Sequence, residues 1–255
     1  MNGIILVDKP QDWTSHDVVA KLRGVLHERR IGHSGTLDPL ATGLLVAFVG
    51  RATRAVEFAE ADSKEYLAGL HLGVSTDTQD ITGNIVAESA ALPDEAALRE
   101  ALGRFIGDIE QIPPMYSAIK IGGKKLYELA RRGESVERAP RKITVSAIDI
   151  AGRDGDDYIL NISCSKGTYV RTLCSDIGEA LGCGACMSSL RRTRAGVFSV
   201  DDAHSLADIE AAVREGRLSD IILPVDTLFA SFPKLTVSQS AAKRLKNGNI
   251  IKISA

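Results

Sequence analysis

Apolar positions in the first third of the chain predict three strands. Residues 4–7 and 44–49 are almost continuously apolar, which is typical of strands that are buried on both faces. Residues 64–74 alternate instead, so that every second residue from Tyr66 to Val74 points the same way. This alternation predicts a strand with one face in the core.

Three segments carry the helical period. Either Thr14 or Ser15 can cap a helix whose apolar residues between 18 and 26 share one face. Pro93 can occupy the start of a second helix, and residues 168–181 predict a third. These helices are expected to pack their apolar faces against the predicted strands.

The second half of the chain contains a clear hairpin. Residues 143–150 and 158–164 read as strands on either side of a turn at 153–156. Strands outnumber crossover helices, which favours an α+β domain with a central mixed or antiparallel sheet flanked by helices, not a βαβ nucleotide fold.

The tail differs in character from the rest. We expect one domain over residues 1–228 and a short appendage over 229–255, because so few residues cannot bury a core of their own. The appendage contains one helical stretch and a final β-like run at 250–253.

Composition narrows the class of protein. Of the 255 residues, 44% are hydrophobic and 25% are charged, as in a soluble globular protein. No apolar run approaches the roughly 20 residues that span a bilayer, and the first residues lack the basic start of a signal peptide. A cytoplasmic protein with reduced cysteines and no membrane association is expected.

Charge is segregated along the chain although the net charge is only −2. Residues 120–142 are basic, and Lys166, Arg171, Arg191, Arg192 and Arg194 form a second cluster. Such a distribution can give a basic face that binds phosphates, or it can simply be solvated helix surface. Charge alone leaves both readings open.

One polar loop has the composition of a functional site. Residues 29–42 are glycine-rich and place a single carboxylate, Asp38, before Pro39, which restricts it to extended geometry. The lysine of a phosphate-binding P-loop is absent. On local chemistry the alternative is an Asx turn in which Asp38 hydrogen-bonds its own loop.

The cysteines do not suggest a metal. Cys183 and Cys186 form a C-x-x-C pair, but no second pair stands at zinc-binding spacing, and no thioredoxin-like context is predicted. Reduced structural thiols are the favoured interpretation, and no metal site is expected.

Longer motifs make the chain similar to a known family. The segment GHSGTLDPLATGLL at residues 32–45 resembles the catalytic motif of the TruB family, the bacterial tRNA pseudouridine-55 synthases. Further similar stretches follow in order at 8–10, 63–66, 77–80, 113–118 and 164–173, so the likeness covers about residues 3–226. Chance agreement of several collinear motifs is negligible.

The resemblance implies a fold and a set of roles. It implies the pseudouridine synthase fold with a truncated or minimal PUA-like C-terminal remnant. Asp38 matches the catalytic aspartate, with Arg171 as its bidentate partner. The substrate-binding positions are His33, which helps to extrude the base, Tyr66, which stacks on it, Tyr169, which contacts the nucleotide, and Leu190, which forms an apolar wall.

The implied reaction breaks the N1–C1′ bond of a uridine, turns the base and rejoins it at C5. It needs neither a redox step nor a group donor, so no cofactor is expected. A carboxylate can serve as nucleophile or as base, and the sequence leaves both roles open for Asp38.

The expected partner is the T-arm of tRNA, bound by a monomer without guide RNA. Lys124, Lys125, Arg191 and Arg192 are predicted to contact RNA phosphates. Two alternatives are a guide-RNA-dependent synthase and a tRNA-folding chaperone. The insert at 94–105, the segment 113–126 and the lack of a long C-terminal RNA domain argue against the first. The Asp38, Tyr66 and Arg171 set argues against a purely non-catalytic protein.

Overall fold

The computed structural model describes residues 1–60 and 63–251. In these residues one nine-stranded sheet organises the chain, with the order β1–β3–β12–β4–β11–β10–β7, β2 paired to β3 and β13 paired to β12. The strands are β1 (Gly3–Lys9), β2 (Ile31–Ser34), β3 (Thr42–Val49), β4 (Lys64–Leu72), β7 (Gly107–Gln111), β10 (Arg141–Asp154), β11 (Asp157–Cys164), β12 (Ala185–Ala195) and β13 (Phe198–Ser199). The β3–β12 pair is parallel and the other pairs are antiparallel, so the predicted mixed sheet is confirmed.

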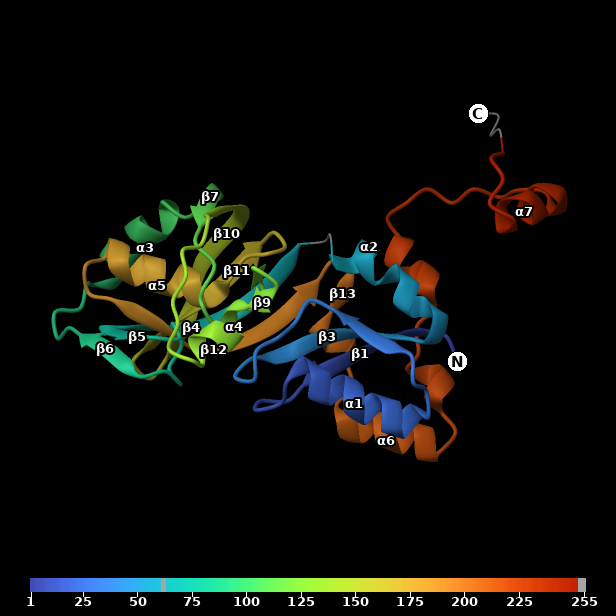
Figure 1. Cartoon of the computed structure of the whole chain (residues 1–255), viewed down its shortest axis with the longest axis horizontal. Helices are drawn as coiled ribbons and strands as arrows, with labels where there is room; N and C mark the ends of the chain where they lie inside the picture. Colours follow the sequence, from blue (N-terminus) through green and yellow to red (C-terminus); the bar gives the residue numbers. More distant parts are fainter. Residues whose placement is uncertain (61–62, 252–255) are drawn as a thin grey trace.

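Helices cover this sheet in two groups (Figure 1). The helices of the chain are α1 (Ser15–Leu26), α2 (Val56–Glu60), α3 (Glu95–Gly103), α4 (Leu126–Ala130), α5 (Val170–Ala180), α6 (Leu206–Arg214) and α7 (Gln239–Lys246). Helices α3 and α5 lie at the end of the molecule that holds β10 and β11, whereas α1 and α6 lie under β1 and β3. The expected α+β architecture is therefore confirmed.

Burial of strand β1 on both faces explains why residues 4–7 are all apolar. Ile5 and Val7 face α1 and α6 in one core cluster. Ile4 and Leu6 face the opposite cluster, which includes residues of the short helices η1 (Gly50–Ala55) and η4 (Val225–Phe229). A strand that is buried on both faces can be apolar at every position.

The first helix begins where its sequence predicts. The Thr14 hydroxyl accepts from the backbone N–H of Asp17 at 3.0 Å, and the Asp17 carboxylate accepts from the Thr14 N–H at 2.9 Å. This capping box satisfies two backbone donors at the helix start.

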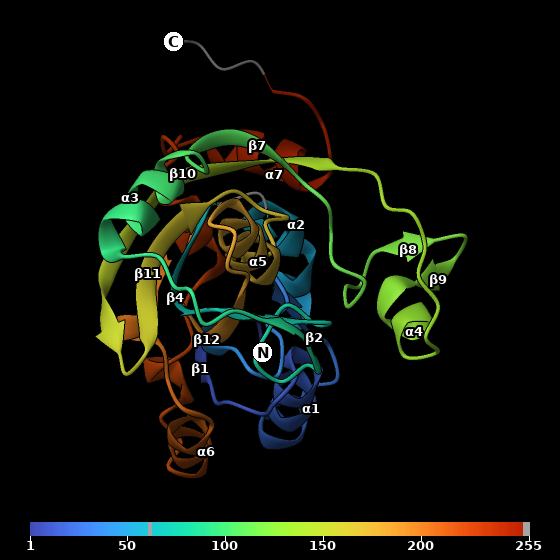
Figure 2. The same ribbon diagram turned by 90° about the vertical axis from the view of Figure 1, so that its left-hand side faces the viewer.

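Two smaller units extend from the main body. Strand β5 (Val74–Thr76) pairs with β6 (Ile85–Glu88), and β8 (Lys120–Ile121) pairs with β9 (Lys124–Lys125). Figure 2 shows β8, β9 and α4 as a projection that stands off to one side of the sheet. We call residues 120–130 the arm.

Two expectations differ from the structure. Residues 31–34, expected within a loop, form β2. Their short, glycine-containing sequence does not predict a strand, and it is the hydrogen bonding to β3 that makes it one. In the tail, residues 250 and 251 are not in a strand, and the rest of the predicted run 250–253 lies outside the described residues.

Helix α7 stands apart from the sheet (Figure 1). No described helix is long and apolar enough to cross a membrane.

Candidate active site

Hydrogen bonds fix the chain on both sides of Asp38, in the loop between β2 and β3. The Ser15 hydroxyl accepts from Leu37 N at 2.9 Å and donates to Leu37 O at 3.1 Å. On the other side, the Lys9 ammonium group donates to Pro39 O at 3.3 Å. Between these anchors the Asp38 side chain is 43% exposed, so it is both held in place and open to a substrate.

Lys9 is a structural residue of this loop. Its side chain is fully buried and also donates to the carbonyl oxygens of Pro10 and Trp13. Burial lowers the pKa of this lysine to about 8. A lysine enclosed in this way holds neighbouring turns together and does not reach an RNA phosphate.

Arg171 is the ionic partner of Asp38. Its Nε lies 2.9 Å from Asp38 Oδ2, and its side chain is only 6% exposed. The terminal nitrogens donate to Thr78 O at 3.1 Å and to Tyr116 O at 2.9 Å. The guanidinium fork is thus shared among three segments, instead of being given to Asp38 alone as the expected bidentate pair requires.

Asp80 completes this arrangement and was not expected from the sequence. Its Oδ2 lies 3.6 Å from Arg171 Nη1, and its Oδ1 accepts from the Thr78 hydroxyl at 3.0 Å. Asp80 is buried. The available signal was the stretch 77–80, which resembles the family but carries no assigned role there.

The start of α5 positions both Tyr169, its N-cap residue, and Arg171, in its first turn. The buried side chain of Gln111 accepts from Tyr169 N at 2.8 Å and donates to Tyr169 O at 3.1 Å. This clamp ties α5 to the end of β7. Burial raises the pKa of Tyr169, so its hydroxyl stays protonated at neutral pH.

Tyr66 and Leu190 lie in the core directly beside the Asp38 loop. They come from β4 and β12, are 7% and 8% exposed, and belong to the same cluster as Leu37 and Ala41. Burial raises the pKa of Tyr66. The structure therefore brings both predicted pocket residues to the segment that carries Asp38.

The prediction that Arg192 binds phosphate is wrong. Its side chain is fully buried, so no RNA phosphate can reach it. Its Nε donates to Leu44 O at 2.7 Å and its Nη2 donates to Gly35 O at 3.0 Å. It also pairs in register with Tyr66, whose phenol lies beside its guanidinium group. Arg192 links both ends of the Asp38 loop to the neighbouring strand.

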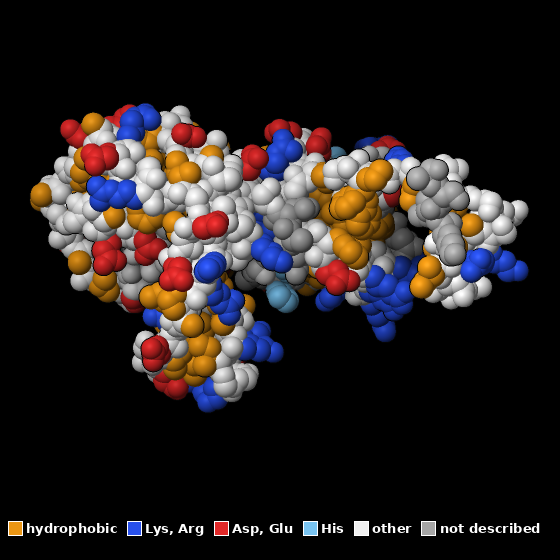
Figure 3. All heavy atoms as spheres, turned by 90° about the horizontal axis from the view of Figure 1, so that it is seen from above, with side chains coloured by type: hydrophobic (Ala, Val, Ile, Leu, Met, Phe, Trp, Pro, Cys, Tyr) orange, Lys and Arg blue, Asp and Glu red, His pale blue; other side chains and the backbone are white. Residues whose placement is uncertain are grey.

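The other three predicted phosphate contacts lie on the surface. Arg191 is 40% exposed and makes a two-pronged ion pair with Asp8, at 3.0 and 2.9 Å. Lys124 is exposed on the arm, while the Lys125 ammonium group donates to the Tyr127 hydroxyl at 3.1 Å. The arm carries Lys120, Lys124 and Lys125, and Arg131 and Arg132 follow it directly; Lys and Arg side chains are seen on this projection in the space-filling view (Figure 3). Lys124 is therefore the most available of the predicted cations.

His33 lies on β2 in a half-buried position. Its ring meets that of His16 edge-on, with centroids 5.9 Å apart. Its Nδ1 is buried with no hydrogen-bond partner among the described residues. Burial, followed by the positive charges of His16 and Arg192, lowers the pKa of His33 from 6.5 to about 4. His33 is thus neutral at physiological pH.

This shift predicts a pH dependence of stability. Because the folded pKa lies below the unfolded one, the unfolded chain binds more protons between about pH 4 and 6.5. The free energy of unfolding should rise with pH across that window, and His33→Gln should reduce the rise. NMR of the His33 ring, assigned by comparison with the variant, should show a midpoint near 4; a midpoint near 6.5 would contradict the assignment.

Both cysteines of the C-x-x-C pair lie in the protein interior. Cys183 and Cys186 are free and buried, and burial raises the pKa of Cys186 to about 11. Within residues 1–60 and 63–251, no group of three or more His, Cys, Asp or Glu side chains could hold a metal ion.

Two protein-family models match consecutive parts of this chain. A model described as TruB family pseudouridylate synthase, N-terminal domain, matches residues 23–170. A second model, tRNA pseudouridylate synthase B C-terminal domain, matches residues 171–230.

Curated relatives match along almost the whole chain. The tRNA pseudouridine synthase B of Alkaliphilus oremlandii is 47% identical over 253 residues, which cover 98% of this chain and 83% of the relative. The protein of the same name from Bacillus licheniformis is 44% identical over 258 residues, with 98% and 84% covered.

Solved structures share the fold. A Cbf5–Nop10–Gar1 complex contains a chain that superposes with a TM-score of 0.77 at 31% identity, covering 96% of this chain and 67% of that one. An H/ACA RNP bound to a substrate RNA containing 2′-deoxyuridine gives a TM-score of 0.75 at 28% identity, with 98% and 67% covered.

Proposed function

Because the chain belongs to the TruB family of pseudouridylate synthases, we propose that it isomerises the T-loop uridine of tRNA, uridine-55, with Asp38 as the catalytic carboxylate. Membership makes the chain a tRNA pseudouridine synthase, an isomerase. The observation that supports Asp38 most directly is its geometry. It is an exposed carboxylate, paired with a buried arginine, in a loop anchored on both sides.

The reaction conserves all the atoms of the nucleoside apart from one exchanged proton. The N1–C1′ bond breaks, the uracil turns, and C5 forms a new bond to C1′. The hydrogen on C5 then leaves and N1 gains one. Asp38 is placed to act at the sugar or the base during this exchange, and Arg171 orients it through a charge-assisted contact.

The base must leave its stack before it can turn, which costs a few kcal/mol. We propose that Tyr66 supplies the aromatic face and Leu190 the apolar wall that hold the extruded base. Their position beside Leu37 and Ala41 supports this role. Stacking of a base on an aromatic ring contributes about 1–3 kcal/mol. Neutral His33, on strand β2, which leads into the Asp38 loop, would help extrusion without adding a charge, and Tyr169 would contact the nucleotide.

We further propose that the enzyme acts alone, as a cytoplasmic monomer on free tRNA without guide RNA. The relatives that match along almost the whole chain are each named tRNA pseudouridine synthase B. The Cbf5 structures are complexes with other proteins or with RNA, and those titles describe those proteins. We also propose a domain boundary near residue 228; this is supported by the second family model, which ends at residue 230.

The experiment that tests the function is tritium release. Unmodified tRNA carrying uridine labelled with tritium at C5 should lose label to water when the purified chain is added alone. A tRNA-folding chaperone would bind the RNA without releasing tritium; this alternative is not favoured because the Asp38–Arg171 pair is intact. No release, with tRNA bound, would overturn the proposal.

The arm is expected to bind phosphates, and salt dependence can test this. Each phosphate contact contributes about 0.7–0.9 to the slope of log affinity against log salt. Lys124→Ala/Lys125→Ala should therefore flatten this slope and weaken the binding of all tRNAs alike. Arg99→Ala is the matched control, because Arg99 is paired with Glu95 on α3. Tyr66→Leu should reduce turnover and leave the slope unchanged. An unaltered slope in the lysine variant would make the arm a solvated face.

A further inference from the structure

The loop between β5 and β6 contains a residue with an unusual backbone conformation. Gln79 has a φ of +65°, in the left-handed region that residues other than glycine rarely adopt. Such a conformation costs free energy and persists only where the surrounding structure fixes it. Gln79 is half-buried and directly precedes the buried Asp80.

Backbone hydrogen bonds hold Gln79 from two sides. Its N–H donates to Thr76 O at 3.2 Å, which closes a turn, and its carbonyl oxygen accepts from Met187 N of β12 at 3.0 Å. The loop returns a second bond to β12, from Ile81 N to Met187 O at 2.9 Å. None of these bonds needs a side chain at position 79, and glycine would suit the backbone better.

The Gln79 side chain makes a separate contact with α5. The Thr172 hydroxyl donates to Gln79 Oε1 at 2.7 Å, and Thr172 is buried. Thr172 follows Arg171, which donates to the residue before Gln79, at Thr78 O, at 3.1 Å. Two successive residues of the helix therefore bind two successive residues of the loop.

These two bonds control how the first turn of α5 is rotated. Successive helical side chains point about 100° apart, so the bonds from Arg171 and Thr172 meet the loop from different directions. Gln111 fixes Tyr169 at the helix start, and the Thr172 bond fixes the turn that follows. Rotation of this turn would move Arg171 Nε, which lies 2.9 Å from Asp38 Oδ2.

We propose that Gln79 is a positioning residue for the reaction, because its bond to Thr172 sets the direction in which Arg171 presents its Nε to Asp38. The proposal rests on the proposed function for the role of Asp38. It accounts for a glutamine at a left-handed position. Glycine would keep the backbone bonds to Thr76 and β12 and would lose the contact with α5.

Exchange of the Arg171 Nε–H proton with water, followed by heteronuclear NMR, tests this geometry without turnover. Thr172→Val removes the hydroxyl and keeps the shape of the side chain. Gln79→Gly removes the amide and suits the left-handed backbone, so this variant should fold. Both should accelerate the exchange by about fivefold or more, because a looser contact with Asp38 opens more often. Thr172→Ser restores the hydroxyl and should exchange at about the wild-type rate.

Turnover should follow the same order. Thr172→Val and Gln79→Gly should each lower the single-turnover rate at saturating tRNA by about fivefold and leave tRNA affinity within about twofold, since they loosen an ion pair and not an RNA contact. Gln79→Gly/Thr172→Val should lose little more than either single variant, because both substitutions remove the same bond.

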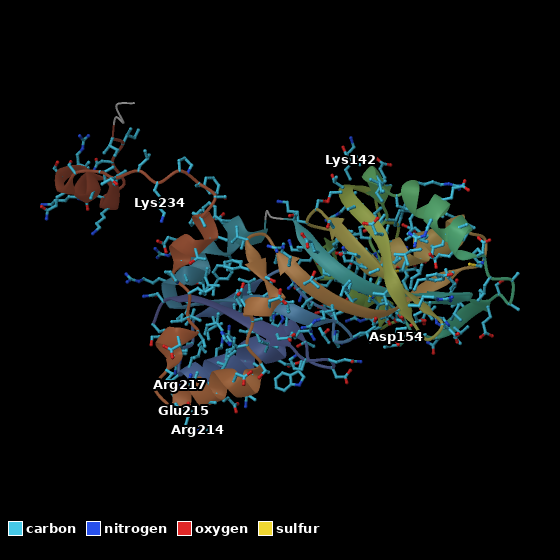
Figure 4. The ribbon with its side chains drawn as sticks, turned by 180° about the vertical axis from the view of Figure 1, so that it is seen from behind. Lys142, Asp154, Arg214, Glu215, Arg217 and Lys234 are labelled. Atoms are coloured by element: carbon cyan, nitrogen blue, oxygen red, sulfur yellow. The ribbon has the colours of Figure 1, made fainter. Side chains whose placement is uncertain are left out.

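His27→Gly is the matched control. His27 is an exposed residue that ends α1, and it is also left-handed, with a φ of +49°. Figure 4 shows α1 beside α6, whose end is labelled at Arg214, and away from β10, which is labelled at Lys142 and Asp154. The same backbone change at position 27 should leave both the Arg171 exchange and turnover unchanged.

Three results would overturn the proposal. The first is exchange of Arg171 Nε–H at the wild-type rate in both Thr172→Val and Gln79→Gly. The second is equally fast exchange in Thr172→Ser, because general loosening of α5 would then be the cause. The third is wild-type turnover in variants with fast exchange. Absence of tritium release by the wild-type chain would instead count against the proposed function, and the exchange measurement would still decide whether Gln79 positions Arg171.

Discussion

Asp38→Asn should reduce pseudouridine formation by more than about a thousandfold, because it removes the carboxylate at the reacting centre. The amide keeps the size of the side chain and can still accept a hydrogen bond from Arg171 Nε. It cannot supply the negative charge needed for attack or for proton abstraction. Tritium release under single-turnover conditions gives the rate of the chemical step.

Binding and folding should survive this substitution. Arg171 keeps its bonds to the carbonyl oxygens of Thr78 and Tyr116, and the loop keeps its anchors at Ser15 and Lys9. The Asn variant should therefore bind tRNA within a few-fold of wild type and unfold at a similar temperature. Turnover near the wild-type rate would remove Asp38 from the catalytic role, whereas lost folding would make the loop and not the carboxylate responsible.

The sheet could be predicted because its strands carry period-two or continuous apolar patterns. Residues 64–72 alternate and form β4, and the hairpin of β10 and β11 has its turn within the predicted segment. Strand β2 escaped prediction because its residues 31–34 include a glycine and two polar residues. Its identity depends on the backbone of β3, a long-range partner that local pattern does not reveal.

Part of the candidate site could also be predicted from patterns in the sequence. Family-like motifs marked Asp38 and Arg171, and the structure brings these residues into contact from distant segments. The residues that fix them, Gln111 and Ser15, act through backbone groups and carry no sequence signature of that role. The burial of individual basic side chains could not be predicted either, because neighbouring residues of one strand point alternately into the core and out to solvent.

Arg191 and Arg192 show this most clearly, since they are adjacent on β12 and point to opposite faces. Arg191 is partly exposed and pairs with Asp8, so its contribution to stability is expected to be at most about 1 kcal/mol. Arg192 is buried, and its guanidinium group donates to the carbonyl oxygens of half-buried Gly35 and buried Leu44. These two carbonyls bracket the Asp38 loop, which makes Arg192 a positioning residue.

Arg192→Met should therefore lower both stability and turnover. It removes the side-chain donor to the carbonyl oxygen of buried Leu44 and the one to the carbonyl oxygen of half-buried Gly35, which should reduce the free energy of unfolding by about 2–5 kcal/mol. Loosening of the loop and of Tyr66 should lower turnover by at least about tenfold, equivalent to about 1.4 kcal/mol in the barrier.

Arg191→Met is the matched control, and it should change the unfolding temperature only slightly. Arg192→Lys, which keeps the charge but loses the fork, should fall between wild type and Arg192→Met in both measurements. The salt slope of tRNA binding by folded Arg192→Lys should equal that of wild type, because a buried guanidinium releases no counterion. If Arg192→Met instead unfolded like wild type and flattened the salt slope, Arg192 would be a phosphate contact after all.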